Sequence, residues 1–267
     1  NMEQVVRDMV GRSITEYYPG RTNEPGEIVL EVKNFCQEGL FNNISFKLRK
    51  GEILGVAGLM GAGRTEIMRA LFGVDSCKHG EVYLHGKKVC IKKPEDAIKA
   101  GIGFITENRK SEGLILDFSI SRNIALPSVD TFAKRSVINA KNETAFSEAL
   151  SKKLGVKTAS IDLEAGALSG GNQQKVVIAK WIGMNPSIII MDEPTRGIDV
   201  GAKRDIYDLM NELTSQGVAI IMVSSELPEV IGMSDRILVI HEGKIAGELD
   251  HEKATQEKII TLATGGQ

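Results

Sequence analysis

Polar and apolar residues alternate from residue 28 to residue 50, which is the pattern of β-strands that bury one face. In the second half of this stretch, apolar side chains occupy every other position: Ile44, Phe46 and Leu48. The segment from 80 to 90 repeats the pattern around a bend at His85 and Gly86. Together these segments predict an antiparallel sheet in the first third of the chain.

Later in the chain the predicted strands become short, continuous apolar runs, which are typical of strands buried on both faces of a parallel sheet. Such runs occupy residues 102–105, 187–191, 218–224 and 236–241. Between two of them, residues 201–217 form a helical pattern that closes on a glycine. Its apolar face contains Ile206, Leu209, Met210 and Leu213. Buried strands that alternate with helices predict an α/β core.

Two further segments differ from this core. Residues 108–180 carry no strand pattern, and apolar residues recur there at four-residue steps, as at Phe146, Leu150 and Leu154. That spacing predicts a helical segment inserted into the α/β core. Residues 1–27 end in a polar stretch with proline and glycine, which predicts a linker outside the core.

Composition and charge narrow the possible functions. The chain has 267 residues, enough for one large domain, and its 33 basic and 35 acidic residues give a net charge of -2. We expect no nucleic-acid partner, because contact with a phosphate backbone usually needs a basic face. No apolar run approaches the roughly 20 residues that span a bilayer, so we expect no membrane-crossing segment.

The segment GLMGAGRTEI, residues 58–67, lies between a predicted strand and a predicted helix. The spacing of its glycines matches a phosphate-binding loop. Glycine is needed there because a residue without a side chain lets the backbone turn sharply, so that N–H groups and the N-terminus of the next helix come close to the phosphate. Thr65 occupies the hydroxyl position that binds Mg²⁺, and Arg64 replaces the usual lysine. A glycine-rich structural turn is the alternative. The residues expected to bind nucleotide are Gly58, Leu59, Met60, Gly61, Ala62, Gly63, Arg64, Thr65 and Glu66.

The apolar run at 187–191 ends in two adjacent carboxylates, Asp192 and Glu193. Burying them is costly unless a cation or a hydrogen-bond donor meets them. In a nucleotide site Asp192 would hold Mg²⁺, and Glu193 would polarise the water that attacks the γ-phosphate. An ordinary turn is the alternative for this dipeptide alone, but the phosphate loop upstream favours the catalytic interpretation.

A second anion-binding surface is predicted at LSGGN, residues 168–172. Here Ser169, Gly170 and Gly171 precede a helical segment, and glycines at a helix start leave N–H groups open to an anion. An ordinary serine N-cap is the alternative. One triphosphate does not obviously need two such surfaces.

The phosphate loop, LSGGN and IIIMDEP, in that order and spacing, resemble the ATP-binding-cassette (ABC) family of ATPases over roughly residues 26–267. Further segments resemble the second cassette in the tandem ATPase subunits of monosaccharide importers, most closely the ribose type. They are ITENRKSEGL, LSGGNQQK, DEPTRGIDVGAK and VSSELPEVIGMSDRILVIHEGKIAGEL. The opening segment RDMVGRSITEYYP resembles the linker between two such cassettes, so residues 1–25 are interpreted as linker and the chain as the C-terminal half of a longer polypeptide.

The resemblance implies a RecA-like P-loop NTPase core, an antiparallel β subdomain and an inserted α-helical subdomain at about residues 108–180. It also implies binding of ATP or ADP with Mg²⁺, and head-to-tail pairing with a second ABC cassette. In such a pair Ser169, Gly170, Gly171 and Asn172 complete the partner's ATP site, which accounts for the second anion surface. The other implied partners are transmembrane permease subunits, and the implied location is the cytoplasmic side of the inner membrane.

Several positions depart from the family's pattern. Arg64 replaces the phosphate-loop lysine, Glu107 stands where a glutamine usually contacts Mg²⁺, and Ser225 stands where a histidine usually contacts the γ-phosphate. Arginine is longer and planar, so it does not reproduce the geometry of a compact ammonium group. The aromatic residue that stacks on adenine has no clear counterpart, and Phe35 is the candidate.

These departures predict a cassette that binds Mg-ATP or Mg-ADP, hydrolyses it poorly at its own site and supports hydrolysis at a partner's site. Because Arg64 and Ser225 depart from the pattern, a second functional class is also possible: a scaffold or regulatory cassette in which nucleotide only stabilises pairing. A soluble cassette ATPase acting on DNA or ribosomes is disfavoured by the neutral charge. Arg109 and Lys110 have two interpretations, either contact with the transporter or a phosphate, or an ordinary solvated loop.

Overall fold

The structure is a computed structural model that describes residues 18–21, 23–134 and 137–266. At its centre lies a six-stranded sheet with the strand order β12-β11-β3-β10-β9-β6. The strands are β3 (Ile53–Gly58), β6 (Ile102–Ile105), β9 (Ile188–Asp192), β10 (Ala219–Val223), β11 (Arg236–His241) and β12 (Lys244–Asp250). All neighbours pair in parallel except the edge strand β12, which runs antiparallel to β11. The predicted parallel core is confirmed.

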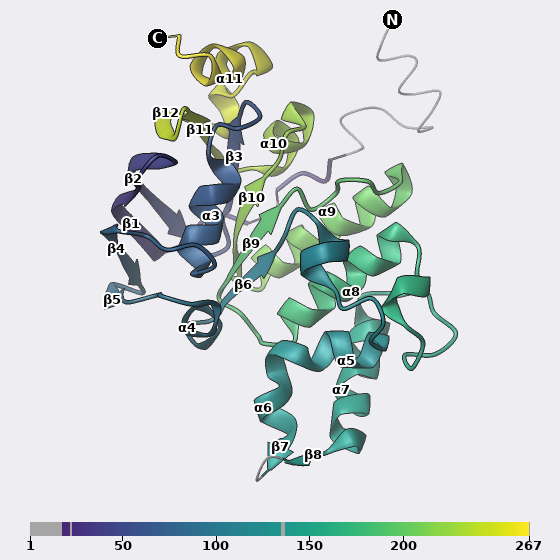
Figure 1. The fold of residues 1–267 in the computed structure, drawn as a ribbon. Helices are drawn as coiled ribbons and strands as arrows, with labels where there is room; N and C mark the ends of the chain where they lie inside the picture. The colour runs from purple at the N-terminus through teal and green to yellow at the C-terminus, as the bar shows by residue number, and fades with distance from the viewer. Residues whose placement is uncertain (1–17, 22, 135–136, 267) are drawn as a thin grey trace, which may run out of the picture.

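A second, antiparallel sheet lies beside the first, at the left of Figure 1. Its order is β2-β1-β4-β5, with strands β1 (Ile28–Gln37), β2 (Phe41–Arg49), β4 (His79–Leu84) and β5 (Lys87–Val89). Val32 pairs with both Phe46 and Val82, and all three side chains are buried. The alternation in the sequence therefore has its physical cause in one face of this sheet packing into the core.

The helices either pack against the six-stranded sheet or project beyond it (Figure 1). They are α3 (Arg64–Phe72), α4 (Pro94–Lys99), α5 (Ile120–Ala125), α6 (Val129–Phe132), α7 (Ala140–Lys153), α8 (Gly170–Ile182), α9 (Val200–Ser215), α10 (Leu227–Met233) and α11 (Gln256–Ala263). Short η turns occupy Arg109–Gly113, Leu126–Ser128, Ala165–Ala167 and His251–Lys253. Within the described residues, no helix is both long and apolar enough to cross a membrane.

Helices α5 to α7 form a projection below the core in Figure 1. At its tip a two-stranded pair, β7 (Ala133–Lys134) and β8 (Val137–Ile138), interrupts the helices. The sequence predicted no strands between residues 108 and 180, and this prediction is wrong for these four residues. Each strand is only two residues long, so neither could produce a readable alternation.

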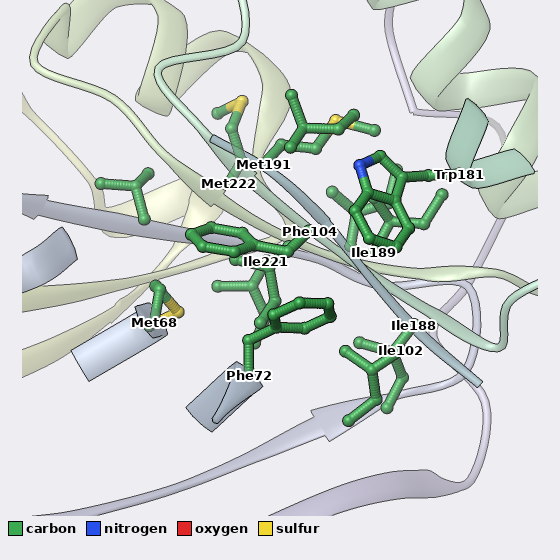
Figure 2. Close-up of a cluster of buried hydrophobic side chains, with 14 of the residues drawn as sticks. Met68, Phe72, Ile102, Phe104, Trp181, Ile188, Ile189, Met191, Ile221 and Met222 are labelled. Atoms are coloured by element: carbon green, nitrogen blue, oxygen red, sulfur yellow. The ribbon is translucent and has the colours of Figure 1, made fainter. Parts of the chain in front are cut away.

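Aromatic side chains pack α3, which follows the phosphate loop, against α8, which begins at the LSGG segment. Phe72 at the end of α3 meets the ring of Trp181 on α8 edge-on, with centroids 5.5 Å apart, and lies 5.3 Å from the ring of Phe104 on β6. Figure 2 shows these rings among the isoleucines of the central sheet. Both helices therefore have fixed positions relative to the strand ends that carry the site.

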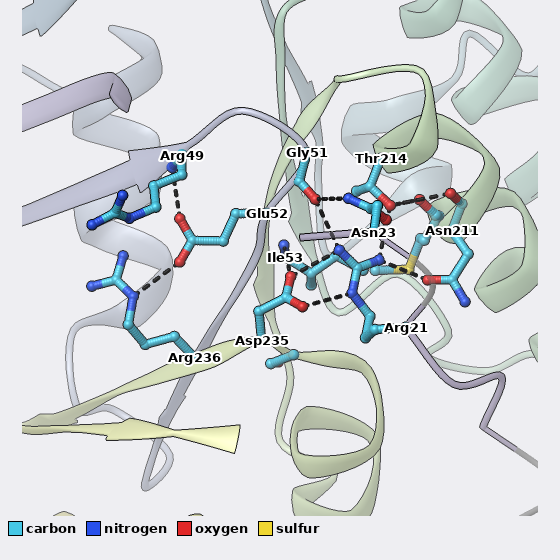
Figure 3. Close-up of polar contacts among 12 residues, drawn as sticks. Arg21, Asn23, Arg49, Gly51, Glu52, Ile53, Asn211, Thr214, Asp235 and Arg236 are labelled. Carbon is cyan, nitrogen blue, oxygen red and sulfur yellow. Dashed lines mark hydrogen bonds and ion pairs between the residues drawn. The ribbon is translucent and has the colours of Figure 1, made fainter. Parts of the chain in front are cut away.

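The described part of the predicted linker packs on the core, so the expectation that this stretch lies apart from it is wrong here. The guanidinium of Arg21 bonds both oxygens of Asp235, at 2.9 and 2.8 Å, and reaches α9 through Asn211 and Thr214 (Figure 3). Tyr18 lies with its ring centroid 5.3 Å from that of Tyr207. The earlier linker residues, 1–17, lie outside the described residues.

Candidate nucleotide site and signature surface

The phosphate loop connects the end of β3 to the start of α3, as predicted. A methyl group at Gly58 would lie 2.5 Å from the carbonyl oxygen of Ile240, and Gly61 has a φ of +78°, so both positions require glycine. The backbone N–H of Gly243, in the turn between β11 and β12, donates to the carbonyl of Ala62 at 2.8 Å. Met60 at the apex is 98% exposed, which leaves this side of the loop open to a ligand.

Arg64 points toward the ends of β9 and β10. Its Nη1 donates to the carbonyl of Ser224 at 2.7 Å, and its Nη2 lies 3.7 Å from Oε1 of Glu193. The side chains of Arg64 and Glu193 are only 11% and 10% exposed, so solvent screens their attraction weakly. The charge that replaces the phosphate-loop lysine thus faces the predicted catalytic glutamate.

Asp192 ends β9 and is completely buried. Neither of its carboxylate oxygens receives a hydrogen bond of normal geometry from the described residues. Burial raises the pKa of Asp192 to about 6, and the nearby hydroxyl of Thr65 offsets this only in part. A buried, unpartnered carboxylate beside a hydroxyl is the donor set that Mg²⁺ accepts when phosphate oxygens supply further ligands. These residues fit the predicted metal.

Glu193 follows directly and adopts a left-handed backbone with a φ of +49°, which is uncommon outside glycine and typical of functional sites. Its N–H donates to the carbonyl of Val223 at 2.9 Å, which holds this conformation against β10. The hydroxyl of Ser225 donates to Oε2 at 3.1 Å. Burial raises the pKa of Glu193, as a general base requires, while Arg64 opposes that rise.

A buried polar network supports these strand ends, and sequence reasoning missed it. The carboxylate of Glu229 on α10 accepts a hydrogen bond from Thr195 at 2.7 Å and a very short one from the hydroxyl of Ser224. All three side chains are at most 1% exposed. In the sequence, the only sign of this network was Glu229 itself, a glutamate among the apolar residues of α10. The network joins the loop after β9 to the loop after β10.

Glu107 follows β6, as predicted, and its close ion pair in this structure is with Arg196, in the loop after β9. Arg109 on the same segment also reaches that loop, where its guanidinium donates to the carbonyls of Arg196 and Gly197 at 2.8 and 3.2 Å. The interpretation of this segment as a merely solvated loop is therefore wrong for Arg109.

The signature residues Ser169 to Asn172 begin α8. The Nδ2 of Asn172 donates to the hydroxyl of Ser169 at 3.0 Å, and its Oδ1 accepts the N–H of Lys157 at 2.8 Å. Asn172, which stands where glutamine is usual, therefore orients Ser169. A methyl group at Gly171 would lie 2.9 Å from the side chain of Ala202 on α9. The signature thus packs on α9.

Phe35 is not available to stack on an adenine ring. Phe35 is 5% exposed and stacks on Phe41 with ring centroids 5.6 Å apart, so its face is already covered. A cavity of about 880 Å³ lies away from the phosphate loop, against Glu31, Lys47 and Arg236. Arg236 there already pairs with Glu52 and Glu248, so this cavity offers no free charge from that guanidinium.

Comparison with known proteins bears on these assignments. A family model described as "ABC transporter" matches residues 41–196. The chain is 62% identical over 266 residues to the ribose import ATP-binding protein RbsA of Oceanobacillus iheyensis and 61% identical over 267 residues to that of Bacillus subtilis. In both comparisons the whole chain aligns with 54% of the relative, so it spans about half the length of these curated relatives.

Solved structures show the same fold at lower identity. One is MJ1267, an ATP-binding cassette of an ABC transporter, with a TM-score of 0.74 and 22% identity over 88% of this chain and 98% of that one. Another is a dimeric, post-hydrolysis structure of the cassette MJ0796 with ADP and Pi, with a TM-score of 0.71 and 22% identity over 83% of this chain and 98% of that one. The predicted RecA-like cassette fold is confirmed.

Proposed function

This chain belongs to the ABC transporter family, and from that premise we propose that it is a nucleotide-binding cassette that serves monosaccharide import of the ribose type. In this proposal it binds Mg-ATP or Mg-ADP at its own phosphate loop, hydrolyses it poorly there, and completes the ATP site of a second cassette. The contact of Arg64 with Glu193 is the observation that carries it. The relatives' name, ribose import ATP-binding protein, supports the import role.

The chain's own site has the parts needed to bind a triphosphate. The amides from Gly58 to Thr65 would surround the phosphates, and Thr65 and Asp192 would hold Mg²⁺, which lowers the charge of the phosphates when bound. Glu107 and Ser225 are proposed as further contacts to the nucleotide or its metal. The buried oxygens of Asp192 support this arrangement, because they accept no hydrogen bond of normal geometry from the described residues and a ligand would supply the missing partner.

Weak hydrolysis at this site follows from the surroundings of Glu193. A general base must be free to accept a proton from the attacking water. Here Oε1 faces the guanidinium of Arg64 and Oε2 accepts the hydroxyl of Ser225. Both partners stabilise the carboxylate anion, which lowers its affinity for a proton, and both occupy oxygens that the attacking water would need.

The second cassette would use the surface formed by Ser169, Gly170, Gly171 and Asn172. The hydroxyl of Ser169 is exposed and oriented by Asn172, and the first N–H groups of α8 are free for an anion. This surface is intact where the chain's own site is altered, which supports an asymmetric pair. The second cassette is proposed to be the N-terminal half of the same polypeptide.

Two measurements test the proposal. The first is titration of this chain with labelled adenine nucleotide and magnesium, for which we expect saturation. The second uses a reporter cassette, defined as an ABC cassette with a lysine phosphate loop and its own signature inactivated. We expect this chain alone to turn over ATP slowly and to activate the reporter strongly. No saturable binding at millimolar nucleotide would contradict the proposal.

Variants separate the two roles of the chain. Changing Ser169 to alanine and Gly170 to a bulky residue should abolish activation of the reporter and leave nucleotide binding to this chain intact. Undiminished turnover of the pair would refute the signature assignment. The Glu193→Gln variant of this chain is the matched control, because it removes the chain's own base and should leave the reporter's turnover unchanged.

The occupied state of Glu193 also favours a second candidate, a non-hydrolytic regulatory cassette in which nucleotide only stabilises pairing. The same reporter assay distinguishes the two functions. A regulatory cassette would bind nucleotide and pair with the reporter without raising its turnover.

We further propose that transmembrane permease subunits contact the helical projection and the segment around Glu107, and that the chain works at the cytoplasmic side of the inner membrane. A groove of about 300 Å³ beside the segment around Glu107 supports the second of these contacts. Its lining combines Thr106 and Glu112 of that segment with the aromatic rings of Phe72, Phe104 and Trp181. Val74 at its rim is 42% exposed. A cysteine at position 74 should cross-link to a permease in assembled transporter, and a cysteine at Lys258 on α11 should not.

A further inference from the structure

One guanidinium connects three segments that are far apart in the sequence. Arg109, in the segment after β6, donates from Nη1 to the carbonyl of Arg196 and from Nη2 to the carbonyl of Gly197. The same Nη2 lies where a methyl group at Gly170 would approach to 2.7 Å, so the signature backbone lies directly against it. The carbonyl oxygen of Gly197 would lie 3.3 Å from that methyl group, so the loop after β9 also lies against the signature backbone.

The described residues offer no acidic partner to the charge of Arg109. No carboxylate lies within ion-pair distance of this guanidinium among the described residues, and its buried Nε has no hydrogen-bond partner there. Burial lowers the pKa of Arg109, with no acidic group to offset it. A guanidinium that pairs only with two carbonyls on consecutive peptide units has a geometric role, because its planar fork matches both acceptors at once.

The neighbouring ion pair reinforces the same junction. Glu107 pairs with the side chain of Arg196, while Arg109 holds the backbone of Arg196. Two contacts from a three-residue stretch therefore reach one loop residue. That loop continues through Gly197 to Asp199, whose Oδ1 caps α9, the helix on which the signature packs.

We propose that Arg109 is a positioning residue that holds the signature, Ser169 to Gly171, and the loop 194–198 in the single arrangement that can complete a partner's nucleotide site. The proposal rests on the function proposed above and extends it to the segment after β6. A change near Glu107, caused by nucleotide or by a membrane partner, would reach the signature through Arg109. Arg109 itself does not contact the nucleotide in this role.

Hydrogen exchange on this chain alone tests the geometry without any partner. The amide of Gln173 donates to Ser169 and the amide of Arg196 donates to Glu193, so both are protected. In the Arg109→Ala variant we expect both amides to exchange about tenfold faster, which corresponds to about 1.4 kcal/mol of local opening free energy. Exchange within twofold of the parent chain at both amides would overturn the proposal.

The reporter cassette tests the consequence. We expect Arg109→Ala to lower the maximal turnover of the reporter about tenfold or more, with nucleotide affinity at this chain's own phosphate loop unchanged within twofold. Arg109→Lys keeps the charge and loses the fork, so it should restore less than half of the lost turnover. Full turnover with lysine would overturn the fork geometry, and loss of nucleotide affinity in both variants would show a general structural role instead.

Two matched controls use neighbouring cations. Lys110→Ala removes the adjacent exposed charge and should change neither exchange nor turnover. Arg196→Ala removes the ion pair with Glu107 and keeps the carbonyl that Arg109 needs, so it should cost less than Arg109→Ala. Equal losses from Arg196→Ala and Arg109→Ala would assign the role to the ion pair and contradict the proposal. If the parent chain fails to activate the reporter, the proposed function fails, and the exchange measurement still decides the role of Arg109.

Discussion

Arg64 and Glu193 lie 3.7 Å apart, between Nη2 and Oε1, at the point where α3 begins and β9 ends. The two residues come from the two motifs that the sequence identifies separately, the phosphate loop and the acidic strand end. Their contact links the main departure from the family's pattern to the residue that should catalyse hydrolysis. The structure therefore places the guanidinium of Arg64 against the proposed base, a contact that the substitution of arginine for lysine does not by itself predict.

Arg64→Lys should raise the turnover of ATP by this chain about tenfold. A shorter side chain cannot hold both the carbonyl of Ser224 and the carboxylate of Glu193, so the base becomes free to polarise water. A general base contributes roughly 10² to 10⁴ in rate, and the absence of a histidine at Ser225 limits the recovery. Steady-state release of phosphate measures this, with nucleotide affinity determined in parallel.

The matched control for this prediction is Arg69→Lys on the same helix. Arg69 pairs with Asp75 at 2.8 Å and with Glu112 at 3.5 Å and not with Glu193, so the turnover of the Arg69→Lys variant should stay at the parent level. A rise with Ser225→His alone and none with Arg64→Lys would show that the missing histidine limits hydrolysis and that the Arg64 contact is irrelevant.

Asp192→Asn should stabilise the fold without nucleotide and weaken binding of the magnesium complex. A buried carboxylate with no hydrogen-bond partner costs free energy that a neutral amide of similar size largely avoids, by about 1–3 kcal/mol. Urea unfolding measures the first effect, and nucleotide titration with and without Mg²⁺ measures the second. A destabilised variant whose affinity no longer depends on Mg²⁺ would leave the metal role standing and contradict the predicted cost of burial.

Much of the site could be predicted from the sequence because its chemistry lies in short, contiguous stretches. The loop around Gly58, the strand end at Asp192 and the helix start at Ser169 each carry a residue pattern whose physical purpose is local. The parallel strands were readable for the same reason, since burial on both faces leaves a continuous apolar run. The alternation of β2 was equally clear.

What the sequence could not predict depends on contacts between distant segments. Arg109 reaches carbonyls 87 and 88 residues further along the chain, and carbonyls leave no trace in a residue pattern. Thr195 and Glu229 meet across 34 residues. Phe35 is aromatic in the right region, yet its face is covered by Phe41, which depends on the register of β1 and β2.

Arg21→Ala should lower the free energy of unfolding by about 2–4 kcal/mol. The guanidinium joins Asp235 to α9 and to the carbonyl of Gly51, and its removal leaves the partly buried carboxylate of Asp235 with the N–H of Ile53 as its remaining donor (Figure 3). Denaturant unfolding measures the loss. Lys253→Ala, which breaks an exposed pair with Asp250 on the same turn, should cost less than about 0.5 kcal/mol. Equal losses in the two variants would mean that the linker residue contributes only an ordinary surface contact.

Burial lowers the pKa of the ammonium group of Lys180, on α8, to about 8. Its Nζ donates to the carbonyl of Gly113 at 2.9 Å, and no acidic partner offsets the burial. Between about pH 8 and the ordinary value of 10.5 the unfolded chain binds the proton that the folded chain has released. The free energy of unfolding contributed by Lys180 should therefore rise with pH in that window, by up to about 1.4 kcal/mol per pH unit, and stay constant below it.

Unfolding curves of the parent chain and of Lys180→Met, measured from pH 7 to pH 10, isolate this contribution, because every other titrating group is common to both. The difference between parent and variant should shift in favour of the parent as the pH rises above 8. Lys175→Met on the same helix is the matched control, since Lys175 pairs with Asp205 at 2.8 Å, and its difference from the parent should not rise in this way. A constant difference for Lys180→Met would show that the ammonium group stays protonated in the folded chain, held by the carbonyl of Gly113 and the face of Trp181, which lies 5.3 Å away.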